Sequence, residues 1–389
     1  MSANTNDITV ACYTFPGFHP SALNRKIFGT DWSEYVLMRQ AQPWYHGHHQ
    51  PRKPALGELD ERRPETWELY NDLARRHGID VFIHDWYWYD HEPAMHEALE
   101  EGFLRSPNRD AMKFAVMWTD HDWPCWIENV LPDGRFDRRV TFPGPQHRSE
   151  DIWRSLAYIV CRYMHLPNYW RIDEKPVLVI FWPFLLGGVP ESRRLLDDLR
   201  DLARKMGHPG VHLHASHGGL LTRELAELGF DSYAHYNPLG DVAIHRPLEE
   251  EIIDYGLLTA EVAEKYWPAW NQLHPLPFFP TVAPGFDNTP RMIPRPRPQG
   301  HPDRTLWPGT VILSNDTPAA FEAFVRAAIG FINTNNVDPR ILMIGCWNEW
   351  TEGHYLLPDL TYGYGKLKDL ASALGLTEPA DPRTYRPDP

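Results

Sequence analysis

Pro176-Val177-Leu178-Val179-Ile180-Phe181 is the stretch of this 389-residue chain that decides its class of fold. Every position in the run is apolar, so a strand formed here is buried on both of its faces. Strands of this kind occur in parallel sheets, where helices cover both sides of the sheet. The stretch therefore predicts an α/β protein, and the remainder of the chain decides which kind.

Other runs of β-branched and aromatic residues resemble this stretch and alternate with longer segments of helical pattern. The expected strands are Ile8–Phe15, Ile79–Trp86, Lys113–Thr119, Pro176–Phe181, Val211–Ser216, Phe230–Tyr236, Phe278–Ala283 and Arg340–Trp347. These alternations favour a closed (β/α)8 TIM barrel with long loops at its C-terminal face; an open doubly wound sheet is the alternative. We expect one barrel domain over residues 1–374 and a loosely held tail, rich in Pro and Asp, over 375–389.

Helix-capping signals support the same alternation. Thr317 followed by Pro318 predicts an N-cap and the first residue of a helix. Gly207 predicts the end of another helix, because glycine readily follows the last helical turn. The apolar stripe expected on that second helix consists of Leu195, Leu196, Leu199, Leu202, Ala203 and Met206.

The charge and the apolar runs limit the class of partner. A formal net charge of −14 argues against nucleic acid or an anionic membrane as a partner, because phosphate repels such a surface. No apolar run approaches the roughly 20 residues that span a bilayer. The N-terminus lacks the basic and apolar regions of a signal peptide, so we expect a cytoplasmic protein if Met1 is the native start.

The cysteines and histidines give no sign of a metal centre. The four cysteines form no CxxC or Cys/His cluster, so neither a zinc site nor another cofactor is expected. Cys12 and Cys346 lie in strand-like runs and are expected to be buried free thiols. His46, His48 and His49 could bind a metal weakly, but we expect them to shape a sugar subsite.

The aromatic content points to carbohydrate. The chain has 16 Trp, 17 Tyr and 17 Phe, and many of them fall at expected strand ends. Aromatic faces stack on the C–H faces of sugar rings, and their rigid side chains lose little entropy on binding. An oligo- or polysaccharide is therefore the expected substrate, although an aromatic-rich core explains the composition equally well.

Polar and aromatic residues follow most of the expected strands. Active sites of these barrels form at the C-terminal strand ends and in the loops that follow. A single histidine there is more often structural, but six of the strand ends share the composition. The candidate sugar-binding residues are His48, His84, Asp85, Trp86, Trp88, Trp118, Asp120, Trp182, His214, His235, Tyr236, Trp347, Asn348, Trp350 and His354.

Glu349 and Glu352 are the candidate catalytic groups. In an extended strand, residues i and i+3 point to opposite faces and lie about 10 Å apart. A turn after Trp347 would bring both side chains to one face, about 5–6 Å apart, and Gly353 would permit the backbone angle needed. That separation resembles the about 5–5.5 Å of retaining glycosidases. The alternative is a pair of solvated loop glutamates that bind arginines.

Three segments resemble the WbsX-like proteins, which are related to the endo-α-mannosidases of glycoside hydrolase family 99. The most specific is a signature, WNEW-x-EG-x-x-L-x-P, which the chain matches at residues 347–358, Trp347-Asn348-Glu349-Trp350-Thr351-Glu352-Gly353-His354-Tyr355-Leu356-Leu357-Pro358, with Tyr362-Gly363-Tyr364 beyond. Residues 45–51, Tyr45-His46-Gly47-His48-His49-Gln50-Pro51, resemble the family's GH-x-QP stretch, and residues 78–88 resemble its GIDGF-x-x-Y-Y-W strand. The resemblance extends from Cys12 to about Leu370 and implies a (β/α)8 barrel.

The resemblance also implies a mechanism. In the endo-α-mannosidase relatives the configuration is retained through an anhydro-sugar, because the sugar's own 2-hydroxyl attacks C1. Carried over by position, Glu349 is the base on that hydroxyl and Glu352 is the acid and then the base toward water. Glu352 then needs a raised pKa, which we expect from a pocket walled by Trp347 and Trp350.

Two features set this chain apart from the family pattern. His84-Asp85 stands where many relatives carry tyrosines, which puts mannose specificity in doubt. The stretch from Asp287 to Pro308 is rich in proline, contains Trp307, and predicts a semi-rigid lid over the barrel mouth. Its basic residues would favour an anionic glycan unless they pair with Asp or Glu elsewhere; they are Arg291, Arg295, Arg297 and Arg304.

Three other functions remain open from the sequence. WbsX-like proteins have also been named glycosyltransferases, but the only nucleotide-sugar motif is a weak one, Asp120-His121-Asp122. A non-catalytic glycan-binding barrel would keep the aromatic residues, although the intact glutamate pair argues against it. A polysaccharide lyase would suit the basic lid and the many His and Tyr residues.

Overall fold

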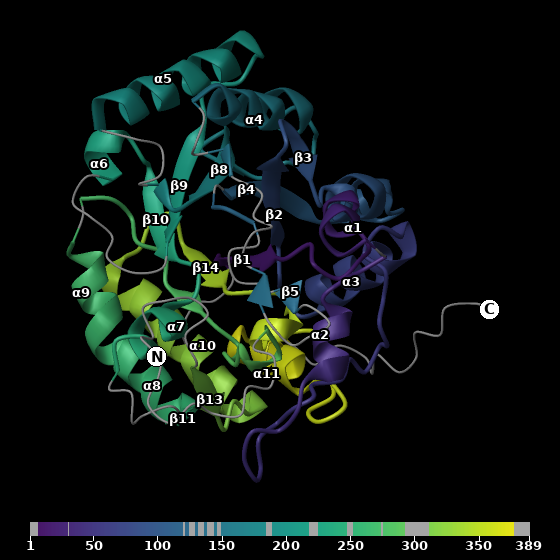
Figure 1. The fold of residues 1–389 in the computed structure, drawn as a ribbon. Helices are drawn as coiled ribbons and strands as arrows, with labels where there is room; N and C mark the ends of the chain where they lie inside the picture. The colour runs from purple at the N-terminus through teal and green to yellow at the C-terminus, as the bar shows by residue number, and fades with distance from the viewer. Residues whose placement is uncertain are drawn as a thin grey trace.

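The computed structural model shows the architecture in Figure 1. It describes residues 7–29, 31–119, 121–123, 129–130, 136–137, 144–145, 149–183, 189–217, 225–246, 252–273, 275–291 and 311–376.

The centre of the molecule is a nearly closed barrel of parallel strands. In spatial order they are β10 (Ser232–His235), β9 (His212–His217), β8 (Lys175–Phe181), β4 (Lys113–Thr119), β2 (Val81–Tyr89), β1 (Thr9–Thr14), β14 (Ile341–Ile344) and β12 (Thr281–Val282). A parallel bridge between Tyr233 and Phe278 joins β10 to the segment before β12 and brings the two ends of the sheet together. Each expected strand is present, and the TIM-barrel prediction is confirmed against the doubly wound alternative.

The barrel wall is uneven in length. β2 and β4 pair over seven residues, from Val81↔Lys113 to Tyr87↔Thr119. β12 has only two residues, fewer than the expected Phe278–Ala283, because Pro280 precedes it and offers no N–H to the ladder.

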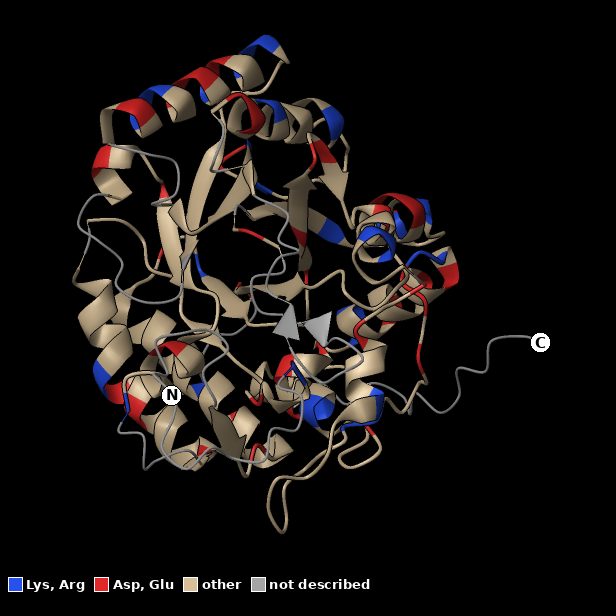
Figure 2. Ribbon diagram, viewed as in Figure 1, with Lys and Arg blue, Asp and Glu red and all other residues tan. Residues whose placement is uncertain are grey.

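Helices surround the barrel, and α4, α5 and α6 lie outside β8, β9 and β10 in Figure 1. The α-helices are α1 (Ala22–Phe28), α2 (Tyr35–Gln40), α3 (Pro64–Arg76), α4 (Ser149–Arg162), α5 (Val189–Lys205), α6 (Leu225–Leu228), α7 (Pro238–Ala243), α8 (Tyr255–Glu261), α9 (Trp267–Asn271), α10 (Pro318–Asn335) and α11 (Gly365–Ala373). Figure 2 shows the charged residues gathered on outer helices such as α5, whereas the strands are mostly uncharged.

One connection departs from the regular pattern. Between β2 and β4 the chain, which is described throughout this connection, forms a π-helical turn η1 (Ala98–Gly102) and two 3-10 turns, η2 (Phe103–Arg105) and η3 (Arg109–Ala111), in place of an α-helix. Gly102 lies so close to α3 that a Cβ on it would stand 2.4 Å from the Trp67 ring. The tight approach leaves no room for a regular helix surface at this point.

The capping predictions are confirmed, with one correction. Thr317 caps α10 by accepting a hydrogen bond from the Ala320 N–H at 3.3 Å. Gly207 follows α5 with a φ of +91°. Met206 is 45% exposed and lies beyond the last residue of α5, so it does not belong to the buried stripe.

The remaining strands and turns are short. They are β3 (Glu92–Ala94), β5 (Asn129–Val130), β6 (Phe136–Asp137), β7 (Arg171–Ile172), β11 (Ile252–Asp254), β13 (Ile312–Ser314), β15 (Asn348–Glu349), β16 (His354–Tyr355), the π-helical turn η6 (Val262–Tyr266) and the 3-10 turns η7 (Thr289–Arg291) and η8 (Trp350–Glu352). Cys12 and Cys346 are buried free thiols, as expected. Over the described residues, no helix combines the length and apolar character needed to cross a membrane.

Candidate active site

The chain turns sharply after β14 and brings two glutamates together. Glu349 ends the short strand β15, and Glu352 ends the 3-10 turn η8 that follows directly. Gly353 then adopts a left-handed φ of +63°, which confirms the predicted turn. One oxygen of each glutamate and one ring nitrogen of His354 all lie within 4.8 Å of one another. The pair stands at the C-terminal end of the barrel strands, where active sites of this fold form.

A single buried arginine holds both glutamates. Arg291 ends η7, in the connection after β12; its Nη1 lies 2.5 Å from Glu352 Oε1 and its Nη2 lies 3.2 Å from Glu349 Oε1. The same guanidinium binds both carboxylate oxygens of Glu34, at 3.1 and 3.0 Å. Among the described residues, no other Lys or Arg forms an ion pair with these three glutamates. Arg291 therefore pairs with acidic residues, the alternative that the sequence had left open.

The surroundings shift the pKa values of the two glutamates in opposite directions. Burial by itself raises the pKa of Glu349, but the nearby His354 ring, the charge of Arg291 and the hydrogen bond from Tyr236 bring it below its usual value. Burial raises the pKa of Glu352 well above its usual value, and the negative charge of Glu349 adds to this, while Arg291 opposes it only in part. Burial likewise raises the pKa of Glu34. One guanidinium cannot neutralise three buried carboxylates, so this environment favours the ionised form of Glu349 and the protonated form of Glu352.

A tyrosine from another strand of the barrel reaches the same group. The hydroxyl of Tyr236, just after β10, lies 2.9 Å from Glu349 Oε2 and 3.3 Å from Asp85 Oδ2 on β2. Burial raises the pKa of Tyr236 well above its usual value, so its hydroxyl stays protonated and donates to a carboxylate. Tyr236 and Asp85 are the two predicted sugar-binding residues that the structure brings to the glutamate pair from other strands.

His354 completes this cluster, and its position depends on a glycine. Its Nδ1 lies 3.7 Å from Glu349 Oε2, and its ring contacts Tyr236 edge-on at 5.7 Å. A Cβ on Gly345, just after β14, would stand 1.8 Å from His354 Nε2. The absence of a side chain at residue 345 is what allows the imidazole to lie against the end of the strand.

Gly345→Ala should therefore destabilise the protein and displace His354. We expect a loss of about 1–3 kcal/mol in the free energy of unfolding, the usual cost of forcing a methyl group into a packed core. Urea denaturation measures this loss. The matched control is Gly330→Ala on α10, where a Cβ meets nothing within 4 Å and alanine favours the helix by up to about 1 kcal/mol. Equal denaturation midpoints for the two variants would contradict the packing described here.

A second buried residue, Asp287, holds the backbone of Glu352 in place. The backbone N–H of Asp287 donates to the carbonyl oxygen of Glu352 at 2.6 Å. The carboxylate of Asp287 accepts hydrogen bonds from His48 at 3.0 Å and Gln50 at 2.7 Å. His48 Nδ1 accepts from the Trp44 N–H, so Nε2 carries the proton given to Asp287. His48 was expected to contact sugar, but in the structure it contacts Asp287, the residue whose N–H binds the backbone of Glu352.

Four predicted sugar-binding residues lie in the layer between strands and helices. Their polar atoms bond to α4, the loop after it or β1: Trp86 to Tyr163, Trp88 to Asp151, Trp118 to Ser155 and His84 to Thr14. They are buried because residues 84, 86 and 88 point to the face of β2 opposite Asp85. The prediction that these four bind sugar is therefore corrected.

The other predicted histidines and Asn348 also have structural partners. His214 binds Ser232 at 2.8 Å inside the barrel. His235 binds Asp241 at 2.7 Å and stacks on Trp270 at 3.7 Å, on the helix side of β10. Asn348 bonds the backbone N–H and carbonyl of Phe15 at 2.8 and 2.7 Å, so it ties β15 to the end of β1.

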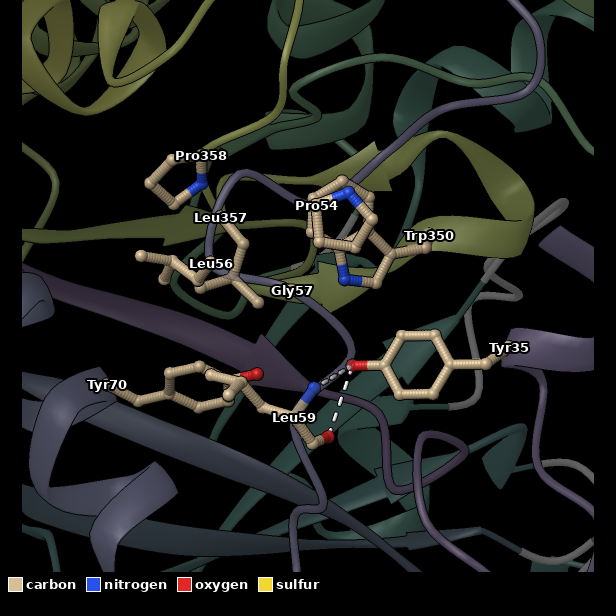
Figure 3. Close-up of a pocket in the computed structure, with 9 residues that line it drawn as sticks. All are labelled: Tyr35, Pro54, Leu56, Gly57, Leu59, Tyr70, Trp350, Leu357 and Pro358. Carbon is tan, nitrogen blue, oxygen red and sulfur yellow. Dashed lines mark hydrogen bonds between the residues drawn. The ribbon is translucent and has the colours of Figure 1, made fainter. Parts of the chain in front are cut away.

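The two indoles expected to wall the acid pocket pack elsewhere. Trp347 contacts Tyr70 and Phe82 in the helix layer. Trp350 stacks on Tyr355 at 3.9 Å and lines a narrow apolar hollow with no room for a water molecule. Figure 3 shows this hollow, lined by Tyr35, Pro54, Leu56, Gly57, Leu59, Tyr70, Trp350, Leu357 and Pro358. Burial of Glu352 among charged groups, and not an indole-walled pocket, accounts for its raised pKa.

Trp182 is the predicted aromatic residue that stays accessible. It is 37% exposed at the end of β8 and stacks on Phe181 with the rings 5.5 Å apart. Several other predictions lie outside the described residues; they are Asp120, Arg295, Arg297, Arg304, Trp307, Cys125 and the tail from residue 377.

Sequence reasoning missed three residues of the site. Glu34 lies in the connection between β1 and α3 and carried no motif. Arg291 was considered only as one of several arginines in a basic stretch. Asp287 was considered only as the start of that stretch, although Asp287-Asn288-Thr289 is a typical Asx-turn sequence: Asp287 Oδ1 accepts from the Thr289 N–H at 3.1 Å.

Comparison with known proteins supports the fold. A solved endo-α-mannosidase of glycoside hydrolase family 99 from Bacteroides thetaiotaomicron, in complex with BIS-TRIS-propane, has a TM-score of 0.57 at 14% identity and covers 94% of this chain and 95% of its own. A solved "glycoside hydrolase-like protein" has a TM-score of 0.57 at 13% identity, with 96% and 95% covered. At such identities the likeness shows the fold alone.

Sequence comparison supports the family. Two curated relatives from strains of Xanthomonas campestris pv. campestris, each named "uncharacterized protein WxcX", are 24% identical over 377 residues, which is 94% of this chain and 49% of theirs. The chain thus spans about half the length of these relatives. A family model described as "Glycosyltransferase WbsX" matches residues 9–370. Since this match covers the whole barrel, the chain belongs to the WbsX family.

Proposed function

We propose that this chain hydrolyses α-glycosidic bonds of a complex glycan with retention of configuration, using Glu349 and Glu352. The observation that carries the proposal is that two neighbouring carboxyl groups have pKa values shifted in opposite directions. Glu349 has a lowered pKa and Glu352 a raised one, and an oxygen of each lies within 4.8 Å of the other. A base and an acid that differ in this way are what glycoside cleavage needs, and the close approach suits a retaining enzyme.

The proposed hydrolysis proceeds in two steps, through an anhydro-sugar intermediate. In the first, Glu349 takes the proton of the sugar 2-hydroxyl, O2 attacks C1, and Glu352 gives its proton to the departing glycosidic oxygen. In the second, Glu352 takes a proton from water, the water oxygen attacks C1, the C1–O2 bond breaks, and Glu349 returns its proton to O2. Two inversions at C1 retain the configuration. The resemblance to the endo-α-mannosidases supports the participation of the 2-hydroxyl.

A product analysis tests the proposal. The protein is incubated with defined α-linked oligosaccharides, and the products are followed by mass spectrometry and by proton NMR before the new anomer equilibrates. We expect cleavage with an α-anomer formed first. A β-anomer formed first, or no cleavage across a broad panel, would contradict the proposal.

The name of the family model favours a second candidate, a glycosyltransferase. Such an enzyme releases a nucleotide from a nucleotide sugar when an acceptor is present. Incubation with nucleotide sugars and acceptor glycans, followed by measurement of free nucleotide, separates the two functions. Sustained, acceptor-dependent release would establish transfer in place of hydrolysis.

The two pKa directions predict a bell-shaped pH profile for hydrolysis. Activity rises as Glu349 loses its proton, at a pH below the usual glutamate value of about 4.3, and falls as Glu352 loses its proton above that value. The pH dependence of kcat/KM measures both limbs. In Glu352→Gln, the residual activity should lose the alkaline limb, because glutamine has no proton to give up. An alkaline limb kept in that variant would assign it to another group.

A further inference from the structure

Asp85 has one carboxylate oxygen that nothing in the described protein satisfies. Oδ2 lies 3.3 Å from the hydroxyl of Tyr236, whereas Oδ1 is buried without a hydrogen-bond partner. Asp85 is only 6% exposed, so bulk water does not solvate this oxygen. An orphaned buried acceptor weakens the folded state, and a ligand that supplies a donor recovers that loss. This oxygen is therefore a place where a bound molecule is expected to hydrogen-bond.

The orphaned oxygen belongs to the same cluster as the glutamates. Asp85 and Glu349 share the Tyr236 hydroxyl, and the negative charge of Glu349 acts on Asp85. Asp85 faces into the barrel, since its strand neighbours, residues 84 and 86, point into the helix layer. A sugar ring whose 2-hydroxyl reaches Glu349 thus presents another hydroxyl toward Asp85.

The charges around this place also restrict the ligand. The guanidinium of Arg291 pairs with the carboxyl groups of Glu34, Glu349 and Glu352, and a fourth carboxyl group, that of Asp85, meets Glu349 at the Tyr236 hydroxyl. His121, which feels the charges of Glu349 and Arg291, is neutral, because burial lowers its pKa to about 3. A carboxylate or sulfate on the reacting ring would enter a buried setting in which Arg291 is already engaged by three glutamates, and a buried anion without a cation of its own is costly.

We propose that Asp85 binds a hydroxyl of the reacting sugar through its free oxygen, and that this ring carries no anionic group. The inference rests on the proposed function, since it assumes that the glutamate pair receives a glycan. It replaces, for the reacting ring, the anionic substrate that the arginine-rich stretch had suggested.

The charge part is tested by binding, without turnover. Methyl α-D-mannoside, α-D-glucoside and α-D-galactoside and the three matching methyl uronides are titrated into Glu352→Gln by saturation-transfer NMR at pH 7. We expect at least one neutral glycoside to bind about tenfold or more tightly than its uronide, and the gap to narrow in the Glu349→Gln, Glu352→Gln double variant. A uronide that binds as well as its neutral partner, or a panel in which no neutral glycoside binds, would overturn the proposal.

The hydroxyl contact is tested by a double-mutant cycle. Monodeoxy analogues of the best neutral glycoside are compared on the parent and on Asp85→Leu, both carrying Glu352→Gln. One analogue should bind the parent about tenfold more weakly than the full sugar but bind Asp85→Leu no more weakly than the full sugar does. Losses that add independently for every analogue would rule out the contact.

Two further variants keep this test decisive. Asp85→Asn retains an oxygen acceptor, so it should keep the binding of the full sugar within about threefold even if Asp85→Leu folds poorly. Asp72→Leu, on the exposed face of α3, is the matched control and should bind like the parent. An Asp85→Asn variant that folds normally and binds no glycoside would also overturn the proposal. Because these experiments measure binding alone, they stand apart from any failure to observe hydrolysis.

Discussion

Replacing Glu349 or Glu352 with glutamine lowers turnover by about two to four orders of magnitude while glycan binding survives. The expected size is that of losing one positioned base or acid in a proton transfer. Glutamine keeps the shape of the side chain but can neither accept the proton of a 2-hydroxyl nor protonate a leaving oxygen. Steady-state hydrolysis of the best oligosaccharide, together with binding by titration calorimetry, separates kcat from affinity.

The matched control for this experiment is Glu191→Gln. Glu191 lies on the outer helix α5 with its side chain 63% exposed, so the same chemical change should leave hydrolysis unaltered. Folding of all three variants is checked by thermal denaturation. If Glu349→Gln and Glu352→Gln both hydrolyse like the parent, the two glutamates are not the catalytic pair.

Arg291→Met should cost about 3–5 kcal/mol in the free energy of unfolding at neutral pH. Removing one member of a buried ion pair leaves its partner uncompensated, and here three buried glutamates lose their shared cation. Methionine fills similar volume, so the loss reports the charge more than a cavity. Chemical denaturation at pH 7 measures it.

The stability of Arg291→Met should also depend on pH in a definite direction. Without the guanidinium, the already raised folded-state pKa values of Glu34 and Glu352 rise further and that of Glu349 also rises, so the folded protein binds more protons than the unfolded chain. Stability of Arg291→Met relative to the parent should therefore be lost as the pH rises from about 4 toward 7. Arg326→Met is the control, because Arg326 is 54% exposed and its pair with Glu322 is worth about 0–1 kcal/mol. Equal stability of Arg291→Met and the parent across this range would contradict the central role of the arginine.

Local sequence was sufficient for the barrel and for the turn that carries the glutamates. Strands such as β8 are apolar runs of the expected length, and Thr317 provides a helix cap within four residues of its partner. Glu349, Glu352 and Gly353 lie so close in sequence that one 3-10 turn decides their relation. Where neighbours along the chain settle a geometry, the pattern of residues predicts it.

The charge balance of the site depends on contacts between distant parts of the chain. Glu34 and Arg291 are separated by 257 positions, and Asp85 meets Tyr236 across 151. No periodicity records such a pairing, because each residue alone is compatible with an exposed position. Only the closed barrel shows that one guanidinium pairs with three glutamates. This shared pairing helps to decide which glutamate favours its protonated form.

What the sequence determined by itself was the run of buried strands, their alternation with helices and the i, i+3 glutamate pair. Tertiary structure alone decided which side of each strand faces the barrel interior, and it turned Trp86, Trp88 and Trp118 away from the candidate site. The physical reason is the same for both outcomes. A strand that is apolar on both faces is easy to recognise as part of a parallel barrel, but it carries no alternation that would mark its inner face.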